Sequence, residues 1–233
     1  MYLPAHFEES RPEVLHALIE RHPFATLITN GPEGLVADTL PFILDPGGAQ
    51  GLGVLRGHVA RANPLWRETR LELPVLVLFQ GEQGYVSPSW YPSKREHGKA
   101  VPTWNYSMVQ VHGTLRAIQD PEWLRAFVTR LTERHESGRA VPWHVADAPA
   151  DYLEAMLKAI VGIELEVTRV EGKFKLSQNR DAADRTGVVL GLEADATAGR
   201  QAQADATAQA MQAAEARRPI KAAESPPPAS PAR

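Results

Sequence analysis

The sequence predicts an α+β fold that is mainly β: an antiparallel β-barrel with helices at its periphery. Apolar runs of strand length follow one another closely and are separated by turn residues. These runs do not alternate with helices, as a parallel doubly wound sheet would require. One expected strand also has a glycine, Gly113, in its interior, which is typical of a bend in a closed barrel.

The chain is expected to open with a helix and then to form strands. Ser10 to Glu13 has the pattern of a capping box, and the dipeptide His22-Pro23 ends the helix. Pro41 interrupts an extended run and indicates an edge strand or a bulge. The further elements expected in this half are strands at 24–29, 35–44, 52–59 and 74–79 and a short helix after Asn63.

The second half continues with longer elements. Residues 106–118 alternate apolar and polar side chains, which predicts a strand with one buried face. Asp120 is expected to cap one helix and Asn179 the last one. The expected elements are a helix that begins at Asp120, a helix at about 149–157, a strand at 163–170 and a helix at about 180–192.

Composition indicates one folded domain with an extension. The 233 residues carry a net charge of −3 and no cysteine, which excludes disulfides, thiolate metal sites and thiol nucleophiles. The first residues do not read as a signal peptide, and no apolar run approaches the roughly 20 residues that span a bilayer. We therefore expect a cytoplasmic protein without a membrane segment. Its acidic balance gives no electrostatic reason to expect broad contact with DNA.

A change of composition near Glu193 marks the expected end of the domain. Residues 193–233 are rich in alanine, hold few large apolar side chains and end in a proline-rich stretch. Such a segment buries little surface, so we expect a folded domain at 1–192 and a mobile Ala/Pro-rich tail at 193–233. Within the tail, residues 201–217 have the composition of a transient helix.

Residues 85–106 hold five of the chain's ten tryptophans and tyrosines. Serines, prolines and a lysine lie between these rings, which suits a wall that is apolar on its face and polar at its rim. A proline-pinned aromatic loop over the core or at a subunit interface would have the same composition, so both interpretations stay open. The residues suited to a ligand are Ser87, Ser89, Trp90, Tyr91, Ser93, Lys94 and Trp104.

Two further polar clusters adjoin the expected strands. Arg56, His58, Arg61 and Asn63 lie where a strand leads into a helix N-terminus, a place that favours anions. The ordinary alternative is a solvated turn with an asparagine cap. Residues 171–180 combine lysines and an arginine with polar donors, and their ordinary alternative is a solvated strand exit with a helix cap.

Catalytic and metal motifs are weak. The eight histidines form no H-E-x-x-H pattern, no G-x-S-x-G occurs, and no metal cluster has convincing spacing. The glycine patterns of Rossmann and P-loop nucleotide sites are also missing. The sequence therefore identifies no catalytic residue and no metal site.

Several long motifs follow one another in a specific order: His58–Pro64, Val86–Lys94, Val101–Tyr106 and Gly172–Asn179, with a similar opening at Met1–Phe7. This order resembles the PaiB-type FMN-binding negative transcriptional regulators over roughly residues 1–192. The resemblance implies a flavin-binding split β-barrel related to pyridoxamine-phosphate-oxidase-like proteins. It also implies a homodimer with FMN in a groove between the subunits.

The same resemblance implies a role for each polar or aromatic cluster. Arg61, Asn63 and Lys94 would contact the FMN phosphate and ribityl chain, with His58 and Ser87 on nearby polar groups. The isoalloxazine would be bordered by Trp90, Tyr91, Trp104 and Asn105, and Thr103 would also contact the cofactor. Lys175 and Gln178 would reach the site from the same or the partner subunit.

Three functions are compatible with this resemblance. The first is an FMN-binding regulator, for which direct DNA binding is doubtful because the domain is acidic and shows no clear helix-turn-helix signal. The second is an FMN-dependent oxidoreductase that uses a nicotinamide cofactor, with the flavin carrying the chemistry. The third is a haem-binding split barrel, with His58 or His112 as the axial ligand.

Overall fold

The computed structural model describes residues 1–48, 51–70 and 73–217. The chain divides into two compact units, which are considered separately. The barrel unit comprises Met1–Gly81 and Tyr106–Lys175, and the helical unit comprises Glu82–Asn105 and Leu176–Arg233. Strands β6 (Val75–Val86) and β7 (Thr103–Ile118) contribute residues to both units.

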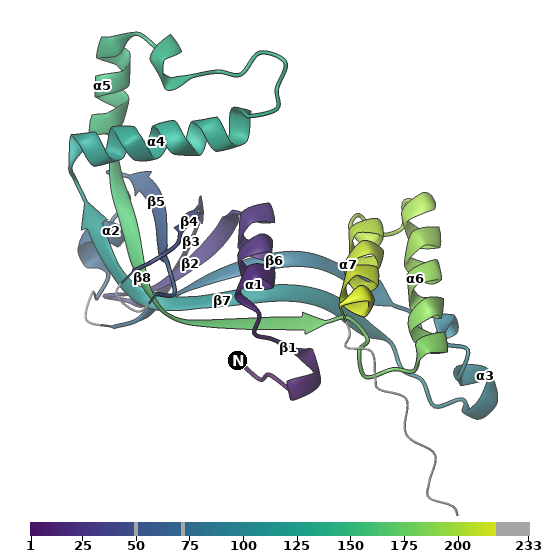
Figure 1. Cartoon of the computed structure of the whole chain (residues 1–233). Coiled ribbons are helices and arrows are strands. Elements are labelled where there is room, and N and C mark those ends of the chain that lie inside the picture. The colour runs from purple at the N-terminus through teal and green to yellow at the C-terminus, as the bar shows by residue number, and fades with distance from the viewer. Residues whose placement is uncertain (49–50, 71–72, 218–233) are drawn as a thin grey trace, which may run out of the picture. The chain divides into compact units, whose positions relative to one another are not determined.

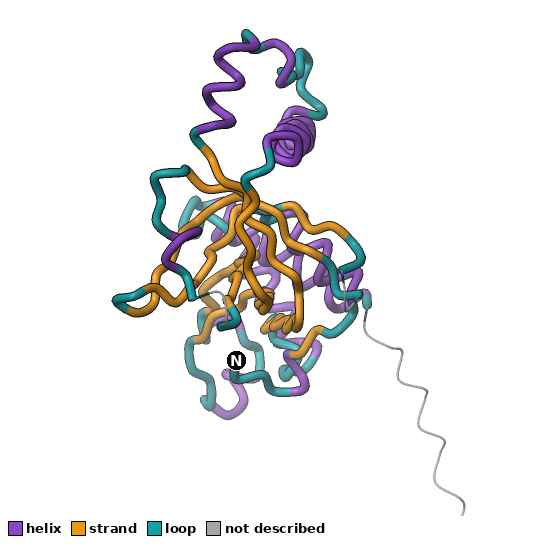
Figure 2. The backbone as a smooth tube through the Cα atoms, turned by 90° about the vertical axis from the view of Figure 1, so that its left-hand side faces the viewer, coloured by secondary structure: helices purple, strands orange, loops and turns teal. Residues whose placement is uncertain are grey.

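The barrel unit is built on one curled antiparallel sheet, seen as strands in Figures 1 and 2. Its strand order is β3-β2-β6-β7-β8-β5-β4, and β1 pairs with β8. The ends of the sheet approach each other because β3 leads directly into β4. A Cβ atom on Gly57 of β5 would lie 3.2 Å from the Pro41 carbonyl oxygen, so these strands meet closely. The remaining strands are β1 (Glu8–Glu9), β2 (Phe24–Gly31), β3 (Gly34–Pro41), β4 (Ile43–Asp45), β5 (Val54–Ala60) and β8 (Ile160–Lys175).

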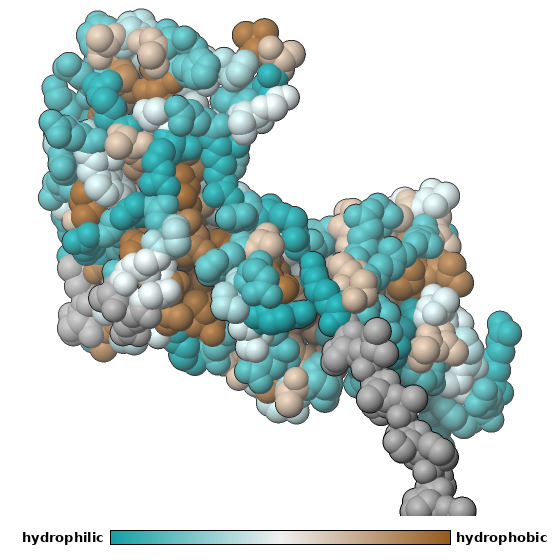
Figure 3. All heavy atoms as spheres, in the orientation of Figure 1, coloured by the Kyte–Doolittle hydropathy of each residue, from teal (hydrophilic) through white to brown (hydrophobic). Residues whose placement is uncertain are grey.

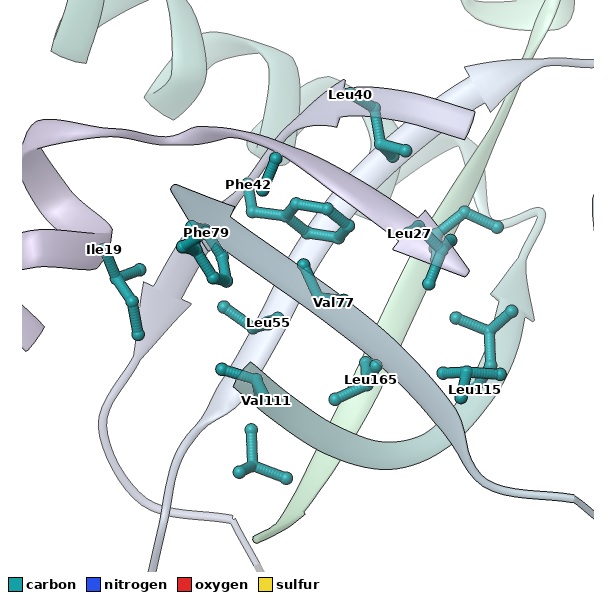
Figure 4. Close-up of a cluster of buried hydrophobic side chains, with 14 of the residues drawn as sticks. Ile19, Leu27, Leu40, Phe42, Leu55, Val77, Phe79, Val111, Leu115 and Leu165 are labelled. Atoms are coloured by element: carbon teal, nitrogen blue, oxygen red, sulfur yellow. The ribbon is translucent and has the colours of Figure 1, made fainter. Parts of the chain in front are cut away.

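The interior of the barrel is apolar and fully enclosed. In Figure 4, Leu55 of β5, Val77 and Phe79 of β6, and Phe42 between β3 and β4 gather in one cluster. All four are 1% exposed or less. Each such side chain contributes about 1.5–3 kcal/mol through removal of its apolar surface from water. Helix α1 (Pro12–Arg21) adds its own apolar face, including Ile19, to this cluster.

Two backbone predictions are confirmed in this unit. The pairing of β7 with β8 shifts register between His112 and Gly113. A Cβ atom on Gly113 would lie 2.1 Å from the Glu166 carbonyl oxygen, so the close approach of β8 requires glycine there. Pro41 ends β3, which is an edge strand in the sheet order, so its missing N–H does not interrupt a ladder.

Helices α2 (Leu65–Glu68), α4 (Pro121–Glu136) and α5 (Ala150–Lys158), with the 3-10 turns η1 (Ala5–Phe7) and η3 (Val145–Asp147), complete the barrel unit. The predicted Asp120 cap is present, since its side chain accepts from the Glu122 N–H at 3.0 Å. The predicted capping box at Ser10 is wrong. Arg11 is the N-cap of α1, and its N–H donates to the Glu9 carboxylate at 3.0 Å instead.

The helical unit holds α6 (Ala182–Thr197) and α7 (Ala204–Ala216) side by side, with the short elements η2 (Pro88–Trp90) and α3 (Lys94–His97). Asp181 caps α6 by accepting from the Asp184 N–H at 2.8 Å, so the predicted cap at Asn179 is displaced by two residues.

The structure differs from the mobile tail expected at 193–233, because part of this segment is helical and packed. Helix α6 continues to Thr197, and α7 buries Ala204, Thr207, Ala208 and Met211. Small side chains permit this packing, because they let two helices approach closely without large apolar residues. The helix expected within residues 201–217 is therefore a packed element of the helical unit. The remainder of the expected tail, residues 218–233, lies outside the described residues.

Candidate functional site

Trp90 belongs to the aromatic segment, residues 85–106, and packs directly on α6. A Cβ atom on Gly191 would lie 2.2 Å from the Trp90 ring, and one on Gly187 would lie 2.1 Å from the Trp90 carbonyl oxygen. Only hydrogen at these two positions lets the helix come so close. The two glycines are four residues apart and therefore lie on one face of α6.

The same face of α6 also holds the residues that follow Trp90. The Asp184 carboxylate is 2% exposed and accepts from the Ser93 N–H at 3.1 Å and from the Ser93 hydroxyl at 2.7 Å. Just before the helix, the Arg180 guanidinium lies 4.6 Å from the centroid of the Tyr91 ring. Burial raises the pKa of Tyr91, and the nearby Arg180 opposes this effect. The aromatic segment and the predicted basic strand exit thus meet in the helical unit.

Asn105 forms a second link between these segments. Its side chain is fully buried, and Nδ2 donates to the Ser177 hydroxyl at 2.9 Å and to the Met211 sulfur at 3.2 Å. Ser177 has a φ of 65°, an uncommon conformation for a residue with a side chain. Gln178 accepts from the Leu176 N–H at 2.7 Å, so it shapes the same turn.

Two aromatic side chains of the helical unit remain open to solvent. Trp104 of β7 is 53% exposed and Tyr85 of β6 is 37% exposed. Their rings meet edge to face, with centroids 6.0 Å apart and planes at 74°. Lys94 begins α3 and is exposed, and Thr103 at the start of β7 is half-buried. Ser87 caps η2, with its hydroxyl 2.7 Å from that of Ser89.

The predicted anion cluster lies in the barrel unit, where Arg61 and Asn63 already have partners. The Arg61 guanidinium donates to the carbonyls of Lys158 and Ile160 at 2.7 and 3.0 Å, and to the Gln119 side chain at 2.8 Å. Asn63 donates to Asp38 at 2.7 Å and accepts from the Leu65 N–H at 2.8 Å. These contacts match the ordinary alternative of a turn with an asparagine cap. Lys175, at the end of β8, lies opposite Tyr106 in the strand pairing.

The two histidines considered as axial ligands have close neighbours. His58 packs edge to face on Phe127, with ring centroids 5.7 Å apart, and burial lowers the pKa of its imidazole. His112 lies 3.2 Å from the Glu171 carboxylate and 3.1 Å from the Arg169 guanidinium. Among the residues that the structure describes, no group of three or more His, Asp or Glu side chains is arranged to hold a metal ion. No helix in the same residues is long and apolar enough to cross a membrane.

Sequence reasoning missed the α6 residues that hold the aromatic segment. Asp184, Gly187 and Gly191 recur at a spacing of three and four, so they form one narrow face of a helix. This face of small and polar residues was the sequence signal that could have indicated the contact between α6 and the aromatic segment. It was overlooked because helix faces are usually recognised by large apolar residues.

The chain matches the model of a family described as a "Putative FMN-binding domain" over residues 1–169. It belongs to this FMN-binding domain family. The match spans the whole barrel sheet except the end of β8, and it includes the aromatic segment. The predicted family and its cofactor, FMN, are thereby confirmed.

Relatives of similar length occur in bacteria and fungi. Protease synthase and sporulation protein PAI 2 of Bacillus subtilis (strain 168) is 33% identical over 193 residues, which covers 83% of this chain and 89% of that protein. Uncharacterized protein AN0679 of Emericella nidulans is 37% identical over 227 residues, which covers 83% of this chain and 90% of that protein.

Solved structures share the fold at lower identity. The flavocytochrome Anf3 from Azotobacter vinelandii has a TM-score of 0.54 and 15% identity, with 77% of this chain and 75% of that chain covered. The FAD and haem binding protein from Mycobacterium smegmatis has a TM-score of 0.53 and 20% identity, with 77% and 78% covered. These likenesses concern the fold alone and confirm the predicted split β-barrel.

The helical unit offers side chains of the chemical types that would hold a flavin mononucleotide. Trp104 and Tyr85 offer accessible aromatic surface for a planar ring system, and the exposed Lys94 can neutralise a phosphate. Hydroxyls of Ser87 and Ser89 lie in the same unit as hydrogen-bond partners for polar groups. When bound, FMN supplies hydride and electron transfer, which no side chain of this set provides by itself.

Proposed function

We propose that this protein is a cytoplasmic FMN-binding regulator of gene expression, with the flavin held in a groove that a second copy of the chain completes. The observation that carries the proposal is the exposed Tyr85–Trp104 pair in a chain of the FMN-binding domain family. Exposed rings of this size on neighbouring strands are costly to leave in water, so they suit a bound ring or a partner surface.

In this proposal the residues divide into binding and positioning groups. Trp104 and Tyr85 border the isoalloxazine, and Lys94 takes the phosphate. Trp90, Tyr91 and Asn105 hold the wall in place, because each is packed or bonded inside the helical unit. Lys175 and Gln178 contribute from either subunit. Arg61, Asn63 and His58 support the barrel, since binding a phosphate would require Arg61 to abandon three acceptors.

The regulatory part of the proposal is supported by the name of the Bacillus subtilis relative, which refers to protease synthase and to sporulation. The net charge of −3 favours an indirect action over direct contact with DNA. We expect no shift of promoter DNA in a gel at moderate salt. A specific shift at that salt would show direct binding and would change the proposed route of regulation.

The binding site is tested by titrating the flavin-free chain with FMN and with riboflavin, which lacks the phosphate. Replacing Trp104 by Ala should raise both dissociation constants about twofold to tenfold, because ring stacking contributes about 0.5–1.5 kcal/mol. Replacing Lys94 by Ala should raise the constant for FMN only. Trp143→Ala is the matched control, since Trp143 is 47% exposed and lies in the barrel unit.

Two further measurements separate the remaining parts of the proposal. Light scattering of the FMN-loaded protein should give twice the 25.6 kDa mass of the chain, and a monomer would remove the shared groove. Rapid oxidation of NADH or NADPH by the loaded protein would favour the FMN-dependent oxidoreductase. Absence of micromolar FMN binding by the wild-type chain would sink the proposal as a whole.

A further inference from the structure

A groove of about 390 Å³ runs along α6 and α7 within the helical unit. Its apolar walls come from Leu176 before α6, Val189 and Leu190 of α6, and Met211 and Ala214 of α7. Figure 3 shows apolar surface over this pair of helices, and Leu190 is 60% exposed. The volume lies within the range of about 300–1,000 Å³ that is usual for small-molecule sites, so the groove suits the apolar body of a small ligand.

The groove carries an uncompensated negative charge. Its charged lining residues are one arginine and two glutamates: Arg185, Glu193 and Glu215. Arg185 and Glu215 form an ion pair at 2.8 Å, so their charges offset each other. Glu193 is half-buried and accepts from the Gln212 side-chain amide at 3.0 Å, but it forms no ion pair within residues 1–48, 51–70 and 73–217. The carboxylate of Glu193 is therefore the charge that a ligand can neutralise.

The hydrogen-bonding capacity of the lining agrees with this charge. The Arg185 guanidinium donates to the Arg180 carbonyl at 2.5 Å and to the Glu215 carboxylate at 2.8 Å, and its Nε is buried. The amide of Gln212 donates to Glu193. A carboxylate can accept about four hydrogen bonds, so Glu193 keeps acceptor capacity after that contact. The lining therefore favours a ligand that brings donors and a positive charge.

The groove shares both of its helices with the aromatic segment. Val189 of α6 lines the groove, whereas Gly191 of the same helix packs against Trp90. On the α7 side, Met211 both lines the groove and accepts from Asn105. A ligand that fills the groove holds α6 and α7 in the arrangement that positions Trp90 and Asn105.

We propose that this groove binds a small organic cation with an apolar ring body, and that its occupancy strengthens flavin binding. The ring body lies on Val189, Met211 and Ala214, and a protonated amine donates to Glu193. An ammonium group brings both the donors and the charge that this carboxylate accepts. The effect on flavin affinity rests on the proposed function, whereas binding of the cation does not.

Calorimetric titration of the full chain tests the site with probes that share a naphthalene ring. The probes are 1-naphthylmethylammonium, the neutral 1-naphthylmethanol and the anionic 1-naphthylacetate. We expect one ammonium probe per chain, bound at least about tenfold more tightly than the alcohol, because a hydrogen bond to a charged group is the stronger kind. The acetate should bind most weakly.

Glu193→Gln isolates the charge, because the amide keeps the size of the side chain. It should bring the ammonium probe within about twofold of the alcohol. Glu133→Gln is the matched control, since Glu133 is exposed on α4 and outside the groove lining. It should keep the preference for the ammonium probe. An equal preference in Glu193→Gln and the wild type would overturn the assignment of a cation to this groove.

Ala214→Trp fills the groove and should weaken all probes at least about tenfold. Gln209→Trp is its control, because position 209 is on α7, exposed and outside the groove lining. It should leave the affinities unchanged, and circular dichroism should show that all variants keep their helices. The site is overturned if the ammonium probe does not bind, if it binds undiminished in Ala214→Trp, or if the alcohol or acetate binds more tightly.

The effect on flavin binding has its own readout. Saturating FMN should lower the dissociation constant of the ammonium probe at least about twofold, and the saturating probe should lower that of FMN by the same factor. A smaller change in a chain that binds both ligands would overturn this effect. Failure of the wild-type chain to bind FMN is seen separately and concerns only the proposed function.

Discussion

Arg61 has a side chain suited to phosphate, but in this fold it donates hydrogen bonds that connect separate elements of the barrel unit. Its guanidinium joins the end of β5 to the start of β8 and to Gln119, which follows β7. These acceptors lie at least 58 residues away in the sequence, so their proximity follows from the barrel and not from the local motif. The local motif indicated that Arg61 is a strong hydrogen-bond donor. It could not indicate which distant acceptors Arg61 binds in the folded chain.

His58 should make the stability of the barrel unit depend on pH. Burial against Phe127 lowers the pKa of His58, so the folded state keeps the imidazole neutral while the unfolded chain protonates near its ordinary value of about 6.5. Stability from this group is complete above pH 6.5 and is lost as the pH falls from that value towards the lowered pKa. Urea unfolding at pH 7.5 and 5.5 should therefore show a smaller loss in His58→Gln than in the wild type.

His135→Gln serves as the control for this measurement, because His135 is exposed on α4. It should follow the wild-type pH dependence. An equal loss of stability in wild type and His58→Gln would mean that His58 is protonated in the fold, contrary to its apolar contact with Phe127.

At the scale of the element, the small residues of α6 allow Trp90 to pack closely against the helix. Alanine is favoured over glycine inside a helix by about 1 kcal/mol, so Gly187 and Gly191 weaken α6 as an isolated helix. Contact with Trp90 offsets that cost only because no Cβ is present at either position. The glycines therefore connect helix stability to the position of the aromatic wall.

Gly191→Ala should destabilise the helical unit despite its better helix propensity. The new methyl group would overlap the Trp90 ring, and overpacking of this kind costs about 1–3 kcal/mol. We expect a lower midpoint in thermal unfolding and a severalfold weaker affinity for FMN. Thr186→Ala on the exposed side of the same helix should change neither property by much. Equal stabilisation of both variants would mean that Trp90 does not contact the helix.

The strands were predictable from the sequence because large apolar residues recur with the period of a strand and are cut by glycine, proline and asparagine. The position of α7 was not predictable in this way. Its buried positions are occupied by Ala204, Thr207 and Ala208, whose composition is also that of a solvated segment. The hydrogen bond between Ser93 and Asp184 was not predictable either. The two residues are 91 positions apart, and both are ordinary polar side chains.

At the scale of the whole molecule, residues beyond 200 complete the helical unit. Gln203 accepts from the Gln83 N–H at 3.0 Å. Gln201 accepts from the Tyr85 N–H at 2.7 Å and donates to the Tyr85 carbonyl. The connection between α6 and α7 therefore satisfies backbone groups of β6 beside the exposed aromatic pair. Met211 adds a contact to Asn105 on the neighbouring strand.

A chain that ends at Arg200 should consequently lose stability and flavin affinity together. Removing Met211 from its buried place costs about 1.5–3 kcal/mol, and each lost hydrogen bond costs about 1 kcal/mol more. We expect a fall of about 10–25 °C in the unfolding midpoint and faster amide exchange at residues 83–85. A chain that ends at Arg217 keeps every described helix and should match the full-length protein in both measurements. If both truncated chains match the full-length protein, α7 has no structural role, and the folded domain ends where the composition of the sequence changes.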